Sequence, residues 1–196
     1  LRRASRTPPF ADAAPVDAVV PSTRISGLIH RFRTVASTPS ALHQGRIMDV
    51  IAFVLAHAGI AHRRDLAAAG FTSYRIGIAI RSGTLVPLGR MWIATASVDP
   101  ALALAASIGG RIACTTAARH LGLWTLTHDT PHVAVPPTSK VPRLDGVRLH
   151  RSIPLAPVRR TSIVESIVDV LAHVAVCLPR EEALVIWESA LRLGRI

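Results

Sequence analysis

A group of arginines, hydroxyl side chains and one tyrosine gathers between residues 63 and 90, and these side chains suit nucleic-acid binding. An arginine guanidinium matches the geometry of phosphate oxygens and of a guanine edge. Hydroxyl groups donate hydrogen bonds to phosphate. The candidate DNA contacts are Arg63, Arg64, Thr72, Ser73, Tyr74, Arg75, Arg81 and Arg90.

Each part of this group has an expected role on a duplex. Thr72 and Ser73, at the start of a helix, would meet a phosphate. Arg75 would reach base edges in the major groove, and Arg90 would enter or follow the minor groove. The other interpretation is that Thr72–Arg75 and Arg81 are only the solvated face of a small three-helix domain.

The surrounding residues predict the elements that position these side chains. Asp49 is a candidate N-cap for a first helix, Gly59 is its expected C′ residue, and Thr72 or Ser73 can cap the third helix. A short hairpin is expected around Gly89-Arg90. The expected helices are 50–58, 60–69 and a third that ends before Ser82-Gly83, and the expected strands are 85–88 and 91–94. This order predicts a winged helix-turn-helix.

The second half predicts a small α+β domain. Pro179 suits the first turn of a last helix that stops at Gly194. The expected helices are 100–108, 112–121, 162–175 and this last one, and the expected strands are 132–136 and 146–151. The complete prediction is an α+β fold with a basic leader at 1–47, a winged helix at 48–96 and an α+β domain at 97–196.

Composition agrees with a folded, cationic protein. The chain has 196 residues, of which 49% are hydrophobic and 18% charged, and its formal net charge is +11. Such a chain can bury a core, which argues against global disorder. Nucleic acid is the commonest partner for this excess of positive charge. Nearly all the cations are arginine, which a GC-rich genome would also produce.

Residues that could support catalysis or bind a metal are sparse. The sequence has no HExxH, GxSxG, Walker or GxGxxG motif, and Lys140 is its only lysine. Glu165 and Asp169 are spaced for one helix face, where a solvated edge is favoured over a catalytic pair. Cys114 and Cys177 lie in no ligand spacing and are expected to be reduced core residues. We therefore expect no enzyme activity, cofactor or metal.

Two groups of histidines could have a functional role. His128 and His132 are four residues apart, but Pro131 denies them a common helix, so hydrogen-bonded or surface roles are favoured. The cluster His150-Arg151-Ser152 ends a predicted strand. It suits a hydrogen-bond anchor there, or alternatively a contact to an anion or a partner.

Location follows from the same residues. No apolar run reaches the roughly 18–20 residues that span a bilayer. With two cysteines expected to be reduced, this predicts a cytoplasmic protein without a membrane partner. The Arg-rich, Pro-containing segment 1–47 is expected to be a disordered leader. A second interpretation is an over-extended reading frame whose natural start is Met48.

The order of segments resembles a known family. The stretch AHAGIAHRRDLAAAGFTSYRIGIAIRSGTLVPLGRMWIAT resembles the N-terminal winged helix of AbiEi-like type IV antitoxins, in their actinobacterial branch. The segments ALALAASIGGRIACTTAARHLGLW, HVAVPP, GVRLHRS and EEALVIWESALRLGRI resemble the domain that follows it there. The resemblance covers residues 48–196.

This resemblance implies a function. Family members bind inverted repeats in their own promoter, repress their toxin–antitoxin operon and counter a nucleotidyltransferase-type toxin, without necessarily binding it. By position, the DNA-contacting basic residues correspond to Arg75, Arg81 and Arg90. Many relatives continue into a Vsr-like endonuclease domain, whereas this chain stops about where that domain would begin, so no nuclease activity is carried over.

Three hypotheses follow. The first is a transcriptional regulator and antitoxin that binds double-stranded DNA and counters a toxin. The second is the DNA-targeting part of a Vsr-like endonuclease whose catalytic domain is lost or truncated. The third is a protein-interaction module.

Overall fold

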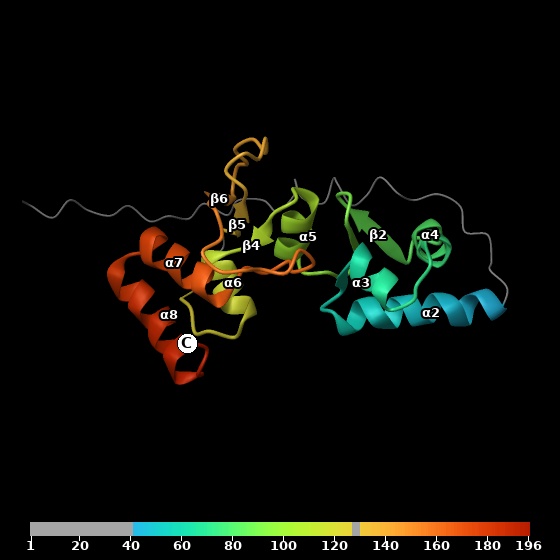
Figure 1. Ribbon diagram of the computed structural model, residues 1–196, viewed down its shortest axis with the longest axis horizontal. Helices are drawn as coiled ribbons and strands as arrows, with labels where there is room; N and C mark the ends of the chain where they lie inside the picture. Colours follow the sequence, from blue (N-terminus) through green and yellow to red (C-terminus); the bar gives the residue numbers. More distant parts are fainter. Residues whose placement is uncertain (1–40, 127–129) are drawn as a thin grey trace, which may run out of the picture. The chain divides into compact units, whose positions relative to one another are not determined.

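The computed structural model describes residues 41–126 and 130–196, with side chains from residue 49 onward (Figure 1). The fold is mixed α+β with two small three-stranded sheets. This confirms the predicted α+β class. Within the described residues, no helix is both long and apolar enough to cross a membrane.

The first sheet and three helices form the first half of the described chain. In chain order they are α2 (Ala41–Ala56), β1 (Ile60–His62), α3 (Arg63–Ala68), α4 (Ser73–Arg81), β2 (Leu85–Leu88) and β3 (Trp92–Thr95). The sheet has the order β1-β3-β2, and both pairings are antiparallel. The predicted hairpin is confirmed, with Gly89 at positive φ in its turn.

Two predictions for this half are wrong. The first helix begins at Ala41 rather than after Asp49, so Asp49 lies inside α2 and does not cap it. The helix expected over 60–69 begins only at Arg63, because Ile60–His62 forms a strand that pairs with Trp92–Ala94. Of the predicted leader, residues 41–47 belong to α2 and residues 1–40 lie outside the described part of the chain.

Alternation along the strands gives the first sheet two buried faces. Ala61, Leu85 and Ile93 face a core built with α2, α3 and α4. Their neighbours Ile60 and Trp92 face the opposite way, into a core that α5 and the second half complete. Successive strand residues point to opposite faces, so burial of all four β3 residues requires cover on both sides.

The second half contains four helices and the second sheet. Its elements are α5 (Pro100–Ser107), β4 (Arg111–Ile112), α6 (Cys114–His120), β5 (His132–Val135), β6 (Arg148–Arg151), α7 (Ile167–Cys177) and α8 (Arg180–Arg192). The sheet order is β4-β5-β6, antiparallel between β4 and β5 and parallel between β5 and β6. The predicted division at 96/97 falls between β3 and α5, yet α5 packs on β3, so the two halves share the larger core.

Helix boundaries in this half also differ from expectation. The helix predicted over 112–121 is strand β4 followed by α6, because Ile112 pairs with Val133. The helix predicted from Ser162 begins at Ile167, with Ser166 as its N-cap. Pro179 is the N-cap residue of α8 rather than its first helical residue.

Candidate functional site

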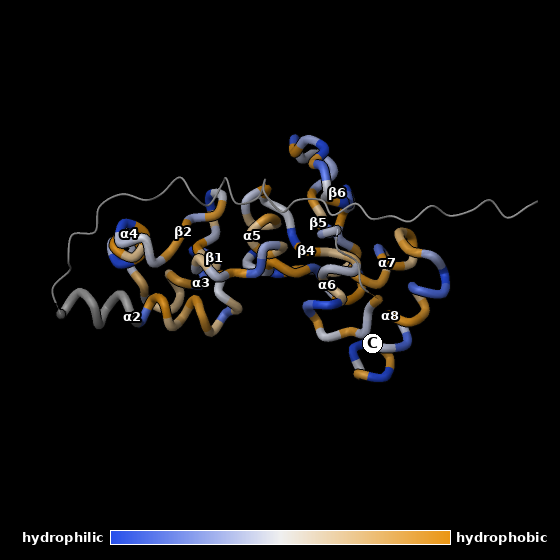
Figure 2. Tube along the Cα trace, turned by 180° about the vertical axis from the view of Figure 1, so that it is seen from behind, coloured by the Kyte–Doolittle hydropathy of each residue, from blue (hydrophilic) through white to orange (hydrophobic). Residues whose placement is uncertain are grey.

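Helix α4 and its N-cap residue Thr72 carry five of the eight predicted DNA contacts, and local interactions fix both ends of the helix. The Thr72 hydroxyl accepts a hydrogen bond from the Arg75 backbone N–H at 3.3 Å, which confirms Thr72 as the predicted cap. The Ser82 N–H donates to the Ile78 carbonyl at the other end. Ile76 and Ala79 are buried in the first core. Figure 2 accordingly shows both hydrophilic and hydrophobic segments along α4.

The opposite side of α4 faces solvent. Tyr74 is 66% exposed and Arg81 is exposed, whereas Arg75 is half-buried. The Nη1 atom of Arg81 lies 3.2 Å from where a Cβ on Gly77 would sit, so the guanidinium folds back over the helix surface. Because Gly77 lies at the centre of α4, the positive charge of Arg81 lies near the middle of this helix.

The remaining predicted contacts flank this helix. Arg63 is half-buried and Arg64 exposed at the start of α3, and Arg90 is exposed at the β2–β3 turn. Thr72 and Ser73 are also exposed. Among the described residues, none of the five predicted DNA-contacting arginines has an acidic partner within ion-pair distance. Their charge is therefore available to an external anion.

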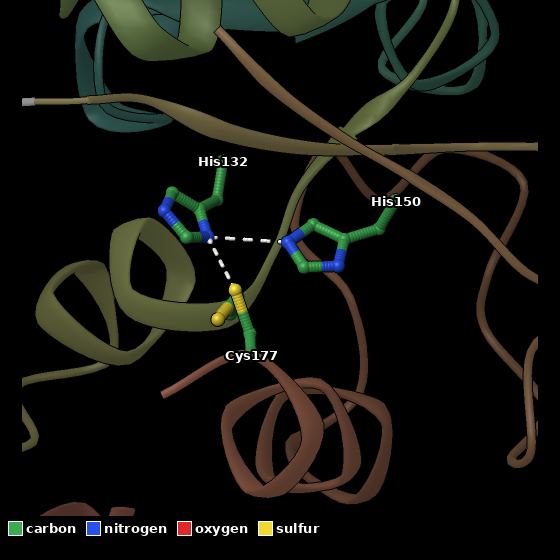
Figure 3. Close-up of side chains that lie close together, drawn as sticks. His132, His150 and Cys177 are labelled. Carbon is green, nitrogen blue, oxygen red and sulfur yellow. Dashed lines mark hydrogen bonds between the residues drawn. The ribbon is translucent and has the colours of Figure 1, made fainter. Parts of the chain in front are cut away.

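A second group of reactive side chains lies in the other half, where the sequence predicted no site. Cys114, His132, His150 and Cys177 each offer one donor atom, and these four atoms all lie within 4.8 Å of one another. His132 Nδ1 lies 3.1 Å from His150 Nε2 and 3.8 Å from Cys177 Sγ. Figure 3 shows His132, His150 and Cys177 directed toward one common point.

Burial shapes the acid–base behaviour of this cluster. Cys114 and His132 are buried, while His150 and Cys177 are half-buried. Burial, reinforced by the neighbouring Cys177, raises the pKa of the Cys114 thiol to about 12. Burial, reinforced by His173 and His132, lowers the pKa of His150 to about 4. These shifts favour a neutral Cys114 thiol and a neutral His150 imidazole.

A series of polar contacts supports one side of the cluster. His173 Nδ1 lies 3.0 Å from a Glu165 oxygen, and His173 Nε2 lies 3.0 Å from the Ser152 hydroxyl. The pKa of His173 is raised chiefly by its hydrogen bond to Glu165. Its ring stacks on that of His150 with centroids 4.5 Å apart, so the series orients the His150 imidazole.

The interpretation of Glu165 and Asp169 as a solvated edge is wrong, because both carboxylates are buried. Glu165 precedes α7 and pairs with His173. Asp169 accepts hydrogen bonds from the Leu155 N–H at 2.6 Å and from the Ser166 hydroxyl at 2.5 Å. These hydrogen bonds compensate for the loss of water around the Asp169 carboxylate.

The cluster His150-Arg151-Ser152 serves as a hydrogen-bond anchor at a strand end, as one interpretation held. The Arg151 guanidinium donates to the Ser139 carbonyl at 2.7 Å and also to the Val141 carbonyl. His128, the other histidine considered with His132, lies outside the described residues.

Sequence reasoning missed the Cys/His cluster as a group. Its members come from the start of α6, β5, β6 and the end of α7, so no short spacing motif connects them. Cys114 and Cys177 are free thiols, and Cys114 is a core residue, as predicted.

Comparison with known proteins leaves the site to be judged on its own geometry. The chain matches no protein-family model, and no curated protein is significantly similar to it. The functional argument therefore depends on the described residues and on the resemblance in the sequence.

Proposed function

We propose that this chain is a DNA-binding transcriptional regulator that lays α4 along a duplex. Three helices followed by an antiparallel hairpin match the element order expected of a winged helix-turn-helix, in which α4 would be the recognition helix and the β2–β3 turn the wing. The observation that carries the proposal is the solvent-facing side of α4, where Tyr74 and Arg81 are exposed while Ile76 and Ala79 hold the opposite side in the core.

Charge supports this proposal. The chain carries a formal net charge of +11, which attracts a polyanion at long range. On α4, Arg75 and Arg81 have no acidic partner within the described part of the chain. They can pair with phosphate or with a guanine edge without first breaking an ion pair.

The resemblance of residues 48–196 to AbiEi-like antitoxins supports a narrower form of the proposal. In that form, the protein is a cytoplasmic type IV antitoxin that represses its own operon. Its functional counterpart is a nucleotidyltransferase-type toxin, which it need not touch. DNA binding by α4 is the step that the described residues support most directly.

Fluorescence anisotropy with a labelled duplex from the region upstream of the gene tests the proposal. The full chain is titrated at fixed salt, and Arg75→Ala and Arg81→Ala are compared with the wild type. Losing one direct base contact costs about 1–3 kcal/mol, or about 5- to 150-fold in Kd. Arg75→Ala keeps the backbone N–H that donates a hydrogen bond to the Thr72 hydroxyl, so the helix cap is retained.

Arg143→Ala is the matched control. Arg143 is exposed in the segment between β5 and β6, so its replacement removes the same charge away from α4. We expect the control to bind within about twofold of the wild type at moderate salt, since one distant charge contributes little there. Equal loss in all three variants, or no binding of any duplex by the wild type, would overturn the proposal and favour an interaction module.

A further inference from the structure

The Cys/His cluster combines four donors of the types that bind zinc. Two thiols and two imidazoles come from Cys114 at the start of α6, His132 on β5, His150 on β6 and Cys177 at the end of α7. Tetrahedral sites with two sulfur and two nitrogen donors are characteristic of zinc or of iron–sulfur centres. A closed set of four protein ligands is typical of structural zinc sites.

The separations between donor atoms match such a site. Zinc–sulfur bonds near 2.3 Å and zinc–nitrogen bonds near 2.0–2.1 Å place tetrahedral ligand atoms about 3.3–3.8 Å apart. His132 Nδ1 lies 3.1 Å from His150 Nε2 and 3.8 Å from Cys177 Sγ. The other donor pairs also lie within 4.8 Å, so shifts of about an ångström would bring the set to bonding distance.

We propose that Cys114, His132, His150 and Cys177 bind one structural Zn²⁺ ion that fastens the second sheet to α6 and α7. The strands of this sheet are only two to four residues long. A metal that bridges four separate elements would stabilise an arrangement with few ladder hydrogen bonds. This site is independent of the proposed DNA-binding surface, which lies on α3, α4 and the β2–β3 turn.

Neighbouring residues hold the proposed ligands in place. His150 stacks on His173, which Glu165 holds at 3.0 Å, so the ring has a fixed orientation. The Thr116 hydroxyl accepts a hydrogen bond from the His132 backbone N–H at 2.8 Å. Cys114 has φ of 48°, a conformation that non-glycine residues rarely adopt and that marks functional sites when neighbours enforce it.

A bound cation would also give the two thiols of the cluster a strong interaction partner. The donor atoms of Cys114 and Cys177 lie within 4.8 Å of each other, and a thiol has only weak hydrogen-bonding capacity. A bound Zn²⁺ deprotonates a coordinating thiol and neutralises the resulting thiolate.

The test measures metal in the untagged full chain, purified without chelator under reducing conditions. We expect about one zinc per chain by mass spectrometry of the metal. After removal of zinc, added Co²⁺ should give the visible absorption bands of a tetrahedral thiolate site. A wild type that neither retains zinc nor takes up Co²⁺, or whose Cys114 and Cys177 are joined by a disulfide, would overturn the proposal.

Ligand variants then locate the metal. His150→Asn and Cys177→Ser change half-buried ligands and should lose zinc at least tenfold more readily to a chelator than the wild type. His120→Asn is the matched control, because His120 is exposed at the end of α6 outside the cluster. Retention of zinc in both ligand variants at the wild-type level would contradict the assignment. Because the wild-type metal content is the first readout, the test does not depend on the variants folding.

Discussion

Gly110 lies where α5 ends and β4 begins, and its replacement by alanine should be strongly destabilising. A Cβ on Gly110 would lie 2.6 Å from the Ala134 carbonyl oxygen, 2.7 Å from Val133 Cγ1 and 3.0 Å from Val135 Cγ1. Because the nearest atom belongs to the backbone of β5, it cannot rotate away. The structure must therefore separate β4 from β5 to accept the methyl group.

The size of the effect follows from overpacking. Forcing an extra carbon into a packed core costs about 1–3 kcal/mol. We expect the upper end of this range for Gly110→Ala, because backbone as well as side chains must move. The lower chain entropy of alanine in the unfolded state offsets about 0.4–1 kcal/mol of it. The expected net loss is about 2 kcal/mol, which lowers Tm by about 4–8 °C in a chain of this size.

Replacing the neighbouring Gly109 is a matched comparison, because it should lower stability through backbone strain rather than through a steric clash. Gly109 has φ of 70° and nothing within 4 Å of its Cβ position. It is the left-handed residue of a Schellman motif, in which the Gly109 N–H donates to Ala106 and the Gly110 N–H to Ala105. Gly109→Ala should cost about 1 kcal/mol for backbone strain alone, and Gly109→Asn should cost less, since asparagine tolerates this conformation.

Urea unfolding followed by circular dichroism measures these differences through the midpoint at constant m-value. The expected order of stability is wild type, Gly109→Asn, Gly109→Ala and then Gly110→Ala. If Gly110→Ala unfolds within about 0.5 kcal/mol of the wild type, then β4 and β5 do not approach as described, and the geometry that brings Cys114 toward His132 is wrong.

Three further predictions concern the first half of the described chain. Thr72→Ala should destabilise by about 1 kcal/mol in urea unfolding, while Thr72→Ser, which keeps the capping oxygen, should not. Burial lowers the pKa of His62, whose Nδ1 accepts the Arg64 N–H, so its contribution to stability should be complete above pH 6.5 and fall as the pH drops below that value. His62→Asn, which can still cap α3 but cannot be protonated, should weaken that pH dependence. Ile93→Ala should cost about 2–5 kcal/mol in the same unfolding assay, because Ile93 is fully buried.

The sequence predicted those elements whose ends are marked by local chemistry. Thr72 caps α4, and Gly89 allows the turn between β2 and β3. The strand Ile60–His62 could not be distinguished from a helical turn, because all three residues are buried and the run shows no alternation. Its identity depends on pairing with Trp92–Ala94, some thirty residues later in the chain.

The Cys/His cluster also depends on residues that are distant in the sequence, so it could not be predicted either. Cys114 and Cys177 are far apart in the sequence, and their histidine neighbours come from two strands that lie side by side only in the folded sheet. Glu165 and Asp169 were misjudged for a related reason. Leu155 becomes a neighbour of Asp169 only after α7 packs against the segment that follows β6, and His173 of α7 reaches Glu165, which lies before the helix begins.

Amide hydrogen exchange with and without a duplex from the upstream region tests the central claim most directly. If α4 lies along DNA, slowed exchange on binding should concentrate in residues 73–90, which cover α4 and the β2–β3 hairpin turn. Exchange in α7 and α8 should remain as in the free protein. Protection confined to the second half, with α4 unchanged by the duplex, would contradict the account.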